Sequence, residues 1–251
     1  MGAELVGAEL VAERLAQVRD RISKAGASPS LVRVVAVTKG FGPEAVEAAV
    51  GAGLLDLGEN YAQELLSKAS EAPAGVRWHF LGGLQRNKLS RLAPQVHLWH
   101  GLDSVEGALA LARRRPAAAV LVQVRITGDG GIDGPGAGSL DGGRGPARAP
   151  RHGASAAEVP GLVDSALEAG LDVRGLMAVG RAQAAREDSR RNFRDVASLA
   201  STLGLSEVSM GMSADFDLAV AEGATIIRLG RALFGQRLPA DVPGRGSARL
   251  G

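Results

Sequence analysis

Short apolar runs rich in valine, isoleucine and leucine alternate with longer amphipathic stretches along almost the whole chain. Runs of the first kind are typical of buried strands, and stretches of the second kind are typical of helices. We expect eight strands, at residues 32–38, 54–57, 76–81, 97–100, 118–126, 173–179, 207–210 and 225–229. We expect helices at residues 3–25, 43–51, 61–70, 85–92, 104–114, 156–169, 182–203 and 214–222.

This order of elements predicts an α/β fold, a single (β/α)₈ TIM barrel with an extra N-terminal helix. Its strands are apolar on both faces because helices cover a parallel sheet. We assign residues 1–238 to the barrel, and a doubly wound open sheet is the alternative. In a barrel, functional groups lie at the C-terminal ends of the strands and in the loops that follow them.

Two segments depart from the alternation. Residues 127–153 hold ten glycines together with prolines and arginines, a composition that cannot bury a core. We predict that this insert is disordered. Residues 239–251 are rich in glycine, proline and arginine, and we predict a flexible tail there.

Composition excludes several classes of protein. The 251 residues contain no cysteine, which excludes disulfides, thiolate metal sites and a cysteine nucleophile. Aromatic residues make up 3 % and the formal net charge is +2, and both values argue against nucleic-acid binding. The sequence has no apolar run long enough to span a membrane and no secretory signal at its start. We expect a cytoplasmic protein that binds neither nucleic acid nor membrane, and a monomer because a barrel closes on itself.

Lys39 ends the first predicted strand, and it is one of only four lysines. A lysine at the end of a buried strand reaches either solvent or a site at the barrel mouth. A desolvated lysine has a lowered pKa and becomes a nucleophile that forms Schiff bases. The residues alone leave both interpretations open.

The segment from Ser209 to Ser213 runs from the seventh strand through a glycine turn to a helix start. Hydroxyl groups and backbone N–H groups at such a turn can hold a phosphate, and barrels commonly bind phosphate after strands seven and eight. Gly230 and Arg231 follow the eighth strand and can complete the site. The competing interpretation makes Ser213 a helix cap and Gly211 a turn residue.

Arg228 interrupts the apolar eighth strand. A buried guanidinium requires an acceptor, which is either a carboxylate or a ligand atom at the mouth. His79, in the third strand, is either a core histidine or a mouth residue. His97 and His100 are three positions apart in a strand and should face opposite sides of the sheet, so we expect no metal site.

A lysine, a phosphate cradle and a buried arginine in one barrel suggest pyridoxal 5′-phosphate (PLP). The residues that carry these features also resemble the pyridoxal-phosphate homeostasis protein family. The matching stretches occur in family order, at residues 36–39, 57–64, 78–88, 174–177, 209–213 and 227–235.

The resemblance implies the barrel of the alanine-racemase N-terminal domain and a cofactor held as a Schiff base. It assigns Lys39 to the covalent link and Asn60 to a place beside the ring. Arg228 would face the pyridine nitrogen. Phosphate binding is assigned to Ser209, Met212, Ser213, Gly230 and Arg231.

The resemblance further implies a role in vitamin B6 homeostasis without catalytic turnover, with apo PLP-dependent enzymes as recipients. Two alternatives remain. A PLP-dependent racemase or lyase of this fold needs a second acid/base, usually a tyrosine from an added domain, and the chain has only Tyr61. A barrel that binds another phosphorylated metabolite needs no covalent link.

The sequence departs from the family pattern at three places. Arg231 stands where the family usually has threonine. Met177 to Arg181 lacks the prolines that usually follow the sixth strand, and Val124 to Thr127 lacks the usual lysine after the fifth.

Overall fold

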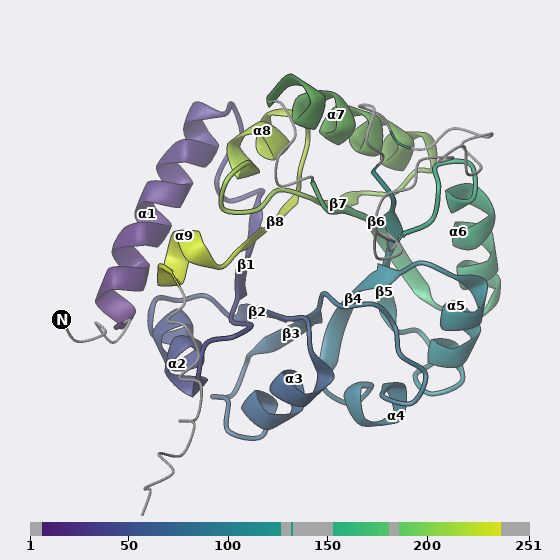
Figure 1. The fold of residues 1–251 in the computed structure, drawn as a ribbon, viewed down its shortest axis with the longest axis horizontal. Helices are drawn as coiled ribbons and strands as arrows, with labels where there is room; N and C mark the ends of the chain where they lie inside the picture. Colours follow the sequence, from purple (N-terminus) through teal and green to yellow (C-terminus); the bar gives the residue numbers. More distant parts are fainter. Residues whose placement is uncertain (1–6, 127–131, 133–152, 181–185, 237–251) are drawn as a thin grey trace, which may run out of the picture.

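A computed structural model describes residues 7–126, 132, 153–180 and 186–236 of the chain. Eight parallel strands close into a barrel in sequence order, and β8 pairs with β1 (Figure 1). The strands are β1 (Arg33–Val37), β2 (Asp56–Glu59), β3 (Arg77–Phe80), β4 (Val96–Leu102), β5 (Ala119–Val124), β6 (Asp172–Ala178), β7 (Glu207–Ser209) and β8 (Ile226–Leu229). The barrel predicted from the sequence is confirmed, and the doubly wound sheet is excluded.

Helices surround the barrel: α2 to α8 connect successive strands, and α9 follows β8 (Figure 1). They are α2 (Pro43–Gly51), α3 (Ala62–Ala69), α4 (Leu89–Leu92), α5 (Val105–Ala112), α6 (Val159–Glu168), α7 (Arg186–Thr202), α8 (Phe216–Ala221) and α9 (Arg231–Phe234). The extra N-terminal helix, α1 (Ala8–Lys24), lies outside this ring and packs against α2, α8 and α9. Four of its apolar residues are buried, and they follow helical spacing: Val11, Leu15, Val18 and Ile22.

Several boundaries differ from the predicted ones because backbone turns take residues from the elements. Leu54 donates its backbone N–H to Ala49 O at 2.9 Å, which closes the end of α2, so β2 begins only at Asp56. Lys88 donates to Gln85 O at 2.8 Å, and the helix expected from residue 85 is reduced to α4. The short helix α9 was not predicted from the sequence.

Side chains alternate between the two faces of each strand, and the core divides accordingly. Most buried apolar residues belong to one large cluster between the barrel and its helices. A second cluster fills the barrel interior, and its members are Val35, Leu98, Ala119, Leu121, Met177 and Ile226. Polar residues at the same inward positions of other strands therefore share the barrel interior.

The predictions for the glycine-rich insert at residues 127–153 and for the tail at residues 239–251 fall on residues outside the described part of the chain, apart from Ile132 and Gly153. Within that part, Ile132 forms an isolated antiparallel bridge with Ile126 just beyond β5. None of the described helices combines the length and the apolar character that crossing a membrane requires.

Candidate functional site

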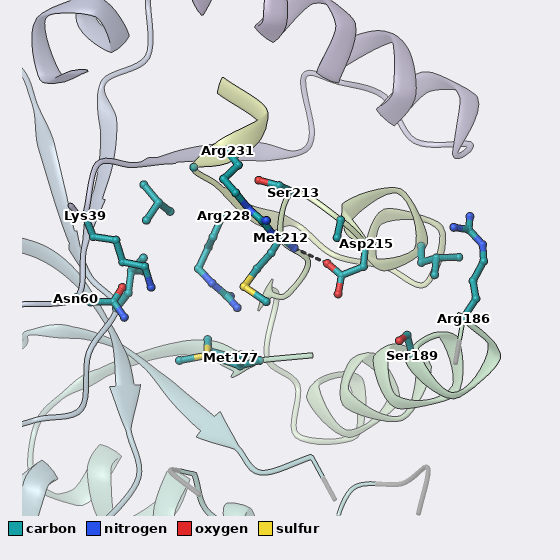
Figure 2. Close-up of a pocket in the computed structure, with 16 residues that line it drawn as sticks. Lys39, Asn60, Met177, Arg186, Ser189, Met212, Ser213, Asp215, Arg228 and Arg231 are labelled. Atoms are coloured by element: carbon teal, nitrogen blue, oxygen red, sulfur yellow. Dashed lines mark hydrogen bonds between the residues drawn. The ribbon is translucent and has the colours of Figure 1, made fainter. Parts of the chain in front are cut away.

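A cavity of about 470 Å³ opens at the C-terminal ends of the strands. Its volume lies within the range of roughly 300–1,000 Å³ that is usual for small-molecule sites. Seven of the eight residues predicted to bind a cofactor line it: Lys39, Asn60, Met212, Ser213, Arg228, Gly230 and Arg231. Figure 2 shows the side chains of Lys39, Asn60, Met212, Ser213, Arg228 and Arg231, which come from β8 and from the loops or turns after β1, β2, β7 and β8.

Lys39 lies in the turn that follows β1, two residues beyond the end of the strand. Phe41 donates its backbone N–H to Thr38 O at 3.0 Å, and Gly40 has a φ of 70°, so the chain turns sharply there. The side chain of Lys39 is half-buried and extends toward Asn60 along one wall of the cavity (Figure 2). Of the two interpretations that the residues alone leave open for Lys39, the structure shows the one at the barrel mouth, because Lys39 lines the cavity.

A buried ion pair between Lys68 and Glu59 holds this turn in place. Lys68 Nζ donates to Glu59 Oε1 at 2.6 Å and to Thr38 O at 2.8 Å. Thr38 Oγ1 donates to the same carboxylate oxygen at 2.6 Å, and Gly40 N–H donates to Glu64 Oε2 at 2.8 Å. Burial raises the pKa of Glu59, while the hydrogen bonds from Lys68 and Thr38 oppose that rise. The cluster fixes the lysine turn on β1 against the end of β2.

The loop after β7 forms the opposite wall. Gly211 has a φ of 88°, and a Cβ there would lie 2.6 Å from Ala219 Cβ, so only glycine fits. Met212 donates its backbone N–H to Asp215 Oδ1 at 2.7 Å. Ser213 Oγ accepts from Ala232 N–H at 3.1 Å and so joins this loop to α9. Asp215 precedes α8 as its N-cap residue, so Ser213 is not the helix cap of the competing interpretation, while Gly211 does have the turn conformation that this interpretation gave it.

Arg231 brings a second cation to the cavity. It is the first residue of α9, its side chain is exposed, and it lies beside Ser213 at the mouth (Figure 2). Gly230 precedes it, and a Cβ there would come within 3.2 Å of Val37 O. Arg186 and Asp215 also line the cavity, and sequence reasoning missed both. Neither stands out in the sequence, because charged residues at the start of a helix are usually solvated.

Arg228 is buried, with 5 % of its surface exposed, and all its hydrogen bonds go to neutral oxygens. Nη1 donates to Ser209 O at 2.8 Å and to Ser209 Oγ at 2.6 Å, and Nη2 donates to Ala178 O at 2.8 Å. Burial lowers its pKa to about 10, so it remains a cation at neutral pH. Among the described residues, no carboxylate lies within ion-pair distance of it. The carboxylate partner considered from the sequence is therefore absent there.

Ser209 is the one predicted site residue that does not line the cavity. Its side chain is fully buried, contacts Arg228 and lies 3.0 Å from His100 Nδ1. The hydroxyl points into the barrel because Ser209 occupies an inward position of β7. The structure thus places it behind the arginine and away from Ser213.

The histidines also belong to the barrel interior. His79 is fully buried between Asp56 and His100, so it is a core residue and not a mouth residue. The expectation that His97 and His100 face opposite sides is wrong, because their rings lie 5.9 Å and 5.2 Å from the His79 ring. The register shifts between Trp78 and His79, and this bulge changes the alternation. The described residues contain no cluster suited to a metal ion.

The donor set fits an anionic aromatic aldehyde. The Lys39 amine and the Asn60 amide lie on one wall, and the Ser213 hydroxyl and the Arg231 guanidinium lie on the other. Arg228 lies between them and makes no ion pair within the described residues, and the charge of Asp215 on the cavity wall acts on it from beyond ion-pair distance. Such a cavity offers a nucleophile at one end and phosphate ligands at the other, as PLP requires.

No family model matches the chain. Curated relatives match it over most of their length. A pyridoxal phosphate homeostasis protein of Deinococcus radiodurans is 39 % identical over 228 residues, which cover 88 % of this chain and 97 % of the relative. Proteins of the same name are 35 % identical over 238 residues in Pseudomonas aeruginosa (92 % and 95 % covered) and 34 % identical over 248 residues in Escherichia coli K12 (90 % and 97 % covered).

Solved structures agree with these relatives. PipY of Synechococcus elongatus PCC7942, with PLP bound, has a TM-score of 0.74 and 30 % identity, and the match covers 90 % of this chain and all of that one. A viral arginine decarboxylase has a TM-score of 0.66 at 14 % identity, covering 91 % of this chain and 63 % of that one, which is a likeness of fold alone. The full-length matches to curated relatives show that this chain belongs to the pyridoxal phosphate homeostasis protein family.

Proposed function

We propose that this chain binds PLP, holds it as a Schiff base on Lys39, and serves intracellular PLP homeostasis. The observation that carries the proposal is that Lys39, Ser213, Arg228 and Arg231 line the same cavity. The curated relatives are named as homeostasis proteins and not as enzymes, and PipY binds PLP in its solved structure. The chain is accordingly a cofactor-binding protein and not an enzyme.

Each residue of the cavity has a role in this proposal. PLP supplies an aldehyde that condenses with a primary amine and releases one water molecule. Lys39 provides that amine, and Asn60 lies beside it to contact the ring. Ser213 and Gly230 lie at the opposite wall and bind the phosphate, beside Met212, whose backbone N–H is already donated to Asp215 Oδ1. Arg231 adds a full positive charge at that end, where the family usually has a neutral threonine.

Arg228 determines what the bound ring can do. A cation facing the pyridine nitrogen disfavours protonation of that nitrogen. A neutral ring withdraws electrons less strongly than a protonated one, so it stabilises carbanions less well. This property suits a protein that stores the cofactor.

The enzyme alternative, a PLP-dependent racemase or lyase, requires a second acid/base on the other face of the ring. The chain has a single tyrosine, Tyr61. It precedes α3 with 62 % of its surface exposed, and it does not line the cavity. We therefore favour the carrier. We further propose a cytoplasmic monomer that delivers PLP to apo PLP-dependent enzymes.

Absorbance titration with PLP tests the covalent link. Wild type should gain the long-wavelength band of a protein Schiff base, and Lys39→Ala should not, because the variant lacks the amine. Lys24→Ala is the matched control, since Lys24 lies on the surface of α1 in an ion pair with Asp20. Retention of the band in Lys39→Ala would refute the assignment to Lys39. If Lys39→Ala loses the band but still binds inorganic phosphate, the cradle is independent of the link.

A further inference from the structure

Five side chains form a continuous hydrogen-bonded chain across the barrel interior. Arg228 Nη1 lies 2.6 Å from Ser209 Oγ, and Ser209 Oγ lies 3.0 Å from His100 Nδ1. His100 Nε2 lies 2.9 Å from His79 Nδ1, and His79 Nε2 lies 2.9 Å from Asp56 Oδ1. This hydrogen-bonded chain begins at the cavity with Arg228 on β8. It passes through Ser209 on β7, His100 on β4 and His79 on β3, and ends at Asp56, the first residue of β2. The pocket and the N-terminal end of the barrel are thus connected by polar groups.

At one end of this hydrogen-bonded chain the residue can only donate hydrogen bonds, and at the other end it can only accept them. Arg228 can only donate, because a guanidinium has no acceptor. Asp56 can only accept, because it is ionised: burial would raise its pKa, but hydrogen bonds from His79 and Arg77 hold the pKa well below its usual range. Arg77 Nε and Nη2 donate to its two carboxylate oxygens at 2.8 Å and 2.6 Å.

The histidines between these ends have one consistent arrangement of protons. Burial lowers the pKa of His79 and, more strongly, that of His100, so each ring carries one N–H. His79 Nε2–H must donate to Asp56, which leaves its Nδ1 to accept from His100 Nε2–H. His100 Nδ1 then accepts from the Ser209 hydroxyl. The Ser209 oxygen is left to accept from Arg228.

We propose that Asp56, His79 and His100 are positioning residues that act through Ser209 to hold the Arg228 guanidinium in place at the cavity. The carboxylate sets the direction of every hydrogen bond in the chain, so Ser209 presents a lone pair to the arginine. This proposal rests on the proposed function for its consequence, because Arg228 is the group we place against the ligand ring. It also removes Ser209 from the phosphate ligands, since its one proton is donated to His100.

One other arrangement satisfies the same distances, and it gives the first test. If His79 were a cation, its Nδ1–H would donate to His100, and His100 would carry its proton on Nδ1. Burial disfavours that cation most strongly and Arg33 and Arg77 add to this, whereas the hydrogen bond and the charge of Asp56 favour it; the net effect lowers the pKa of His79. Nitrogen NMR of the ligand-free protein, with ¹⁵N-labelled histidine, distinguishes the two. We expect both rings to be neutral at neutral pH and protonated on Nε2. A cationic His79, or His100 protonated on Nδ1, would overturn the proposal.

The second test measures PLP binding by variants of β4. His100→Phe keeps a ring in the space and removes the hydrogen bonds of His100 to His79 and to Ser209. Ser209 remains, but its hydroxyl is no longer oriented for Arg228. We expect roughly tenfold weaker PLP binding and a shifted pH profile of the bound-ligand absorbance, since hydrogen bonds to charged groups have effects of this size. His97→Phe is the matched control, because His97 lies on the same strand against His79 without belonging to the chain. If His100→Phe does not fold, Ser209→Ala breaks the chain with a smaller change.

The outcomes separate this proposal from the proposed function. If wild type binds PLP and His100→Phe (or Ser209→Ala) binds it with the same affinity and pH profile as His97→Phe, the positioning role is wrong and the function stands. If wild type binds no PLP, the proposed function fails, and the histidine NMR decides the proton arrangement by itself.

Discussion

Arg228 and Lys68 are both buried cations, and the chain stabilises them in different ways. Lys68 has a direct counter-ion in Glu59, and its side chain is 6 % exposed. Arg228 is bonded to carbonyl and hydroxyl oxygens, and its hydrogen-bonded chain reaches a carboxylate, that of Asp56, only through three intervening side chains. The charge of Asp215 acts on Arg228 from the cavity wall without an ion pair between them. A cation without a direct counter-ion stays available to a ligand, whereas a paired lysine serves the backbone around it. The two residues differ in position accordingly, since Arg228 on β8 lines the cavity and Lys68 on α3 does not.

The Lys68–Glu59 pair predicts a large stability effect from a single substitution. Lys68→Met leaves Glu59 buried without its partner, and breaking a buried pair in this way costs about 3–5 kcal/mol. Urea denaturation should show that loss in the free energy of unfolding. Lys24→Met is the matched control, because the exposed pair with Asp20 contributes less than about 1 kcal/mol. Equal losses in the two variants would contradict this account of the turn.

Among the elements, the loop between β7 and α8 is the most constrained by its geometry. Gly211 combines a positive φ with close approach to Ala219 and Phe216. The loop then carries Met212 and Ser213 into the cavity and is joined to α9 through the bond to Ala232. A single glycine therefore sets how the predicted phosphate end of the site is built.

Gly211→Ala should lose both stability and ligand affinity. The positive φ costs an L-residue about 1–3 kcal/mol, and the contact with Ala219 adds to that cost. Gly204→Ala provides the comparison, because it has a φ of 67° with open space around the Cβ position. Thermal unfolding and PLP titration should show the larger loss in Gly211→Ala. A Gly211→Ala protein as stable as Gly204→Ala would contradict this account, because it would show that the loop accommodates a Cβ at residue 211 at little cost.

The sequence predicted the elements better than their ends. Alternation between apolar strands and amphipathic helices identified all eight strands, because burial on both faces leaves a strong pattern. The start of β2 was misplaced because Leu54 closes the preceding helix, which depends on one backbone bond. The bulge near His79 could not be predicted either, since it arises from the packing of β3 against β4.

At the scale of the whole molecule, barrel closure explains most of the site. Lys39, Asn60, Ser213 and Arg231 are far apart in sequence, but each follows the C-terminal end of a strand, and closure brings those ends together. The rule that functional groups follow the C-terminal ends of barrel strands could be applied to the sequence alone. Sequence reasoning could not find the interior hydrogen-bonded chain from Asp56 to Ser209, because the contact between His100 on β4 and Ser209 on β7 joins strands that are not neighbours.

The lowered pKa of Asp56 predicts how the stability of the whole barrel depends on pH. Its folded pKa lies below its usual value of 3.8, so the unfolded chain binds the proton first. The carboxylate therefore stabilises the fold above that pH, and this contribution is lost as the pH falls below it. Urea denaturation across this pH range should show a steeper fall for wild type than for Asp56→Asn. Parallel curves would mean that Asp56 is not held ionised by Arg77 and His79.

The central claim is that Lys39 holds PLP covalently. The most direct measurement is borohydride reduction of the PLP-loaded protein, followed by peptide mapping with mass spectrometry. The account predicts one pyridoxyl adduct, on the peptide that contains Lys39, together with loss of the long-wavelength absorbance. An adduct on Lys68 or Lys88 in its place, or no adduct in a protein that binds PLP, would contradict it.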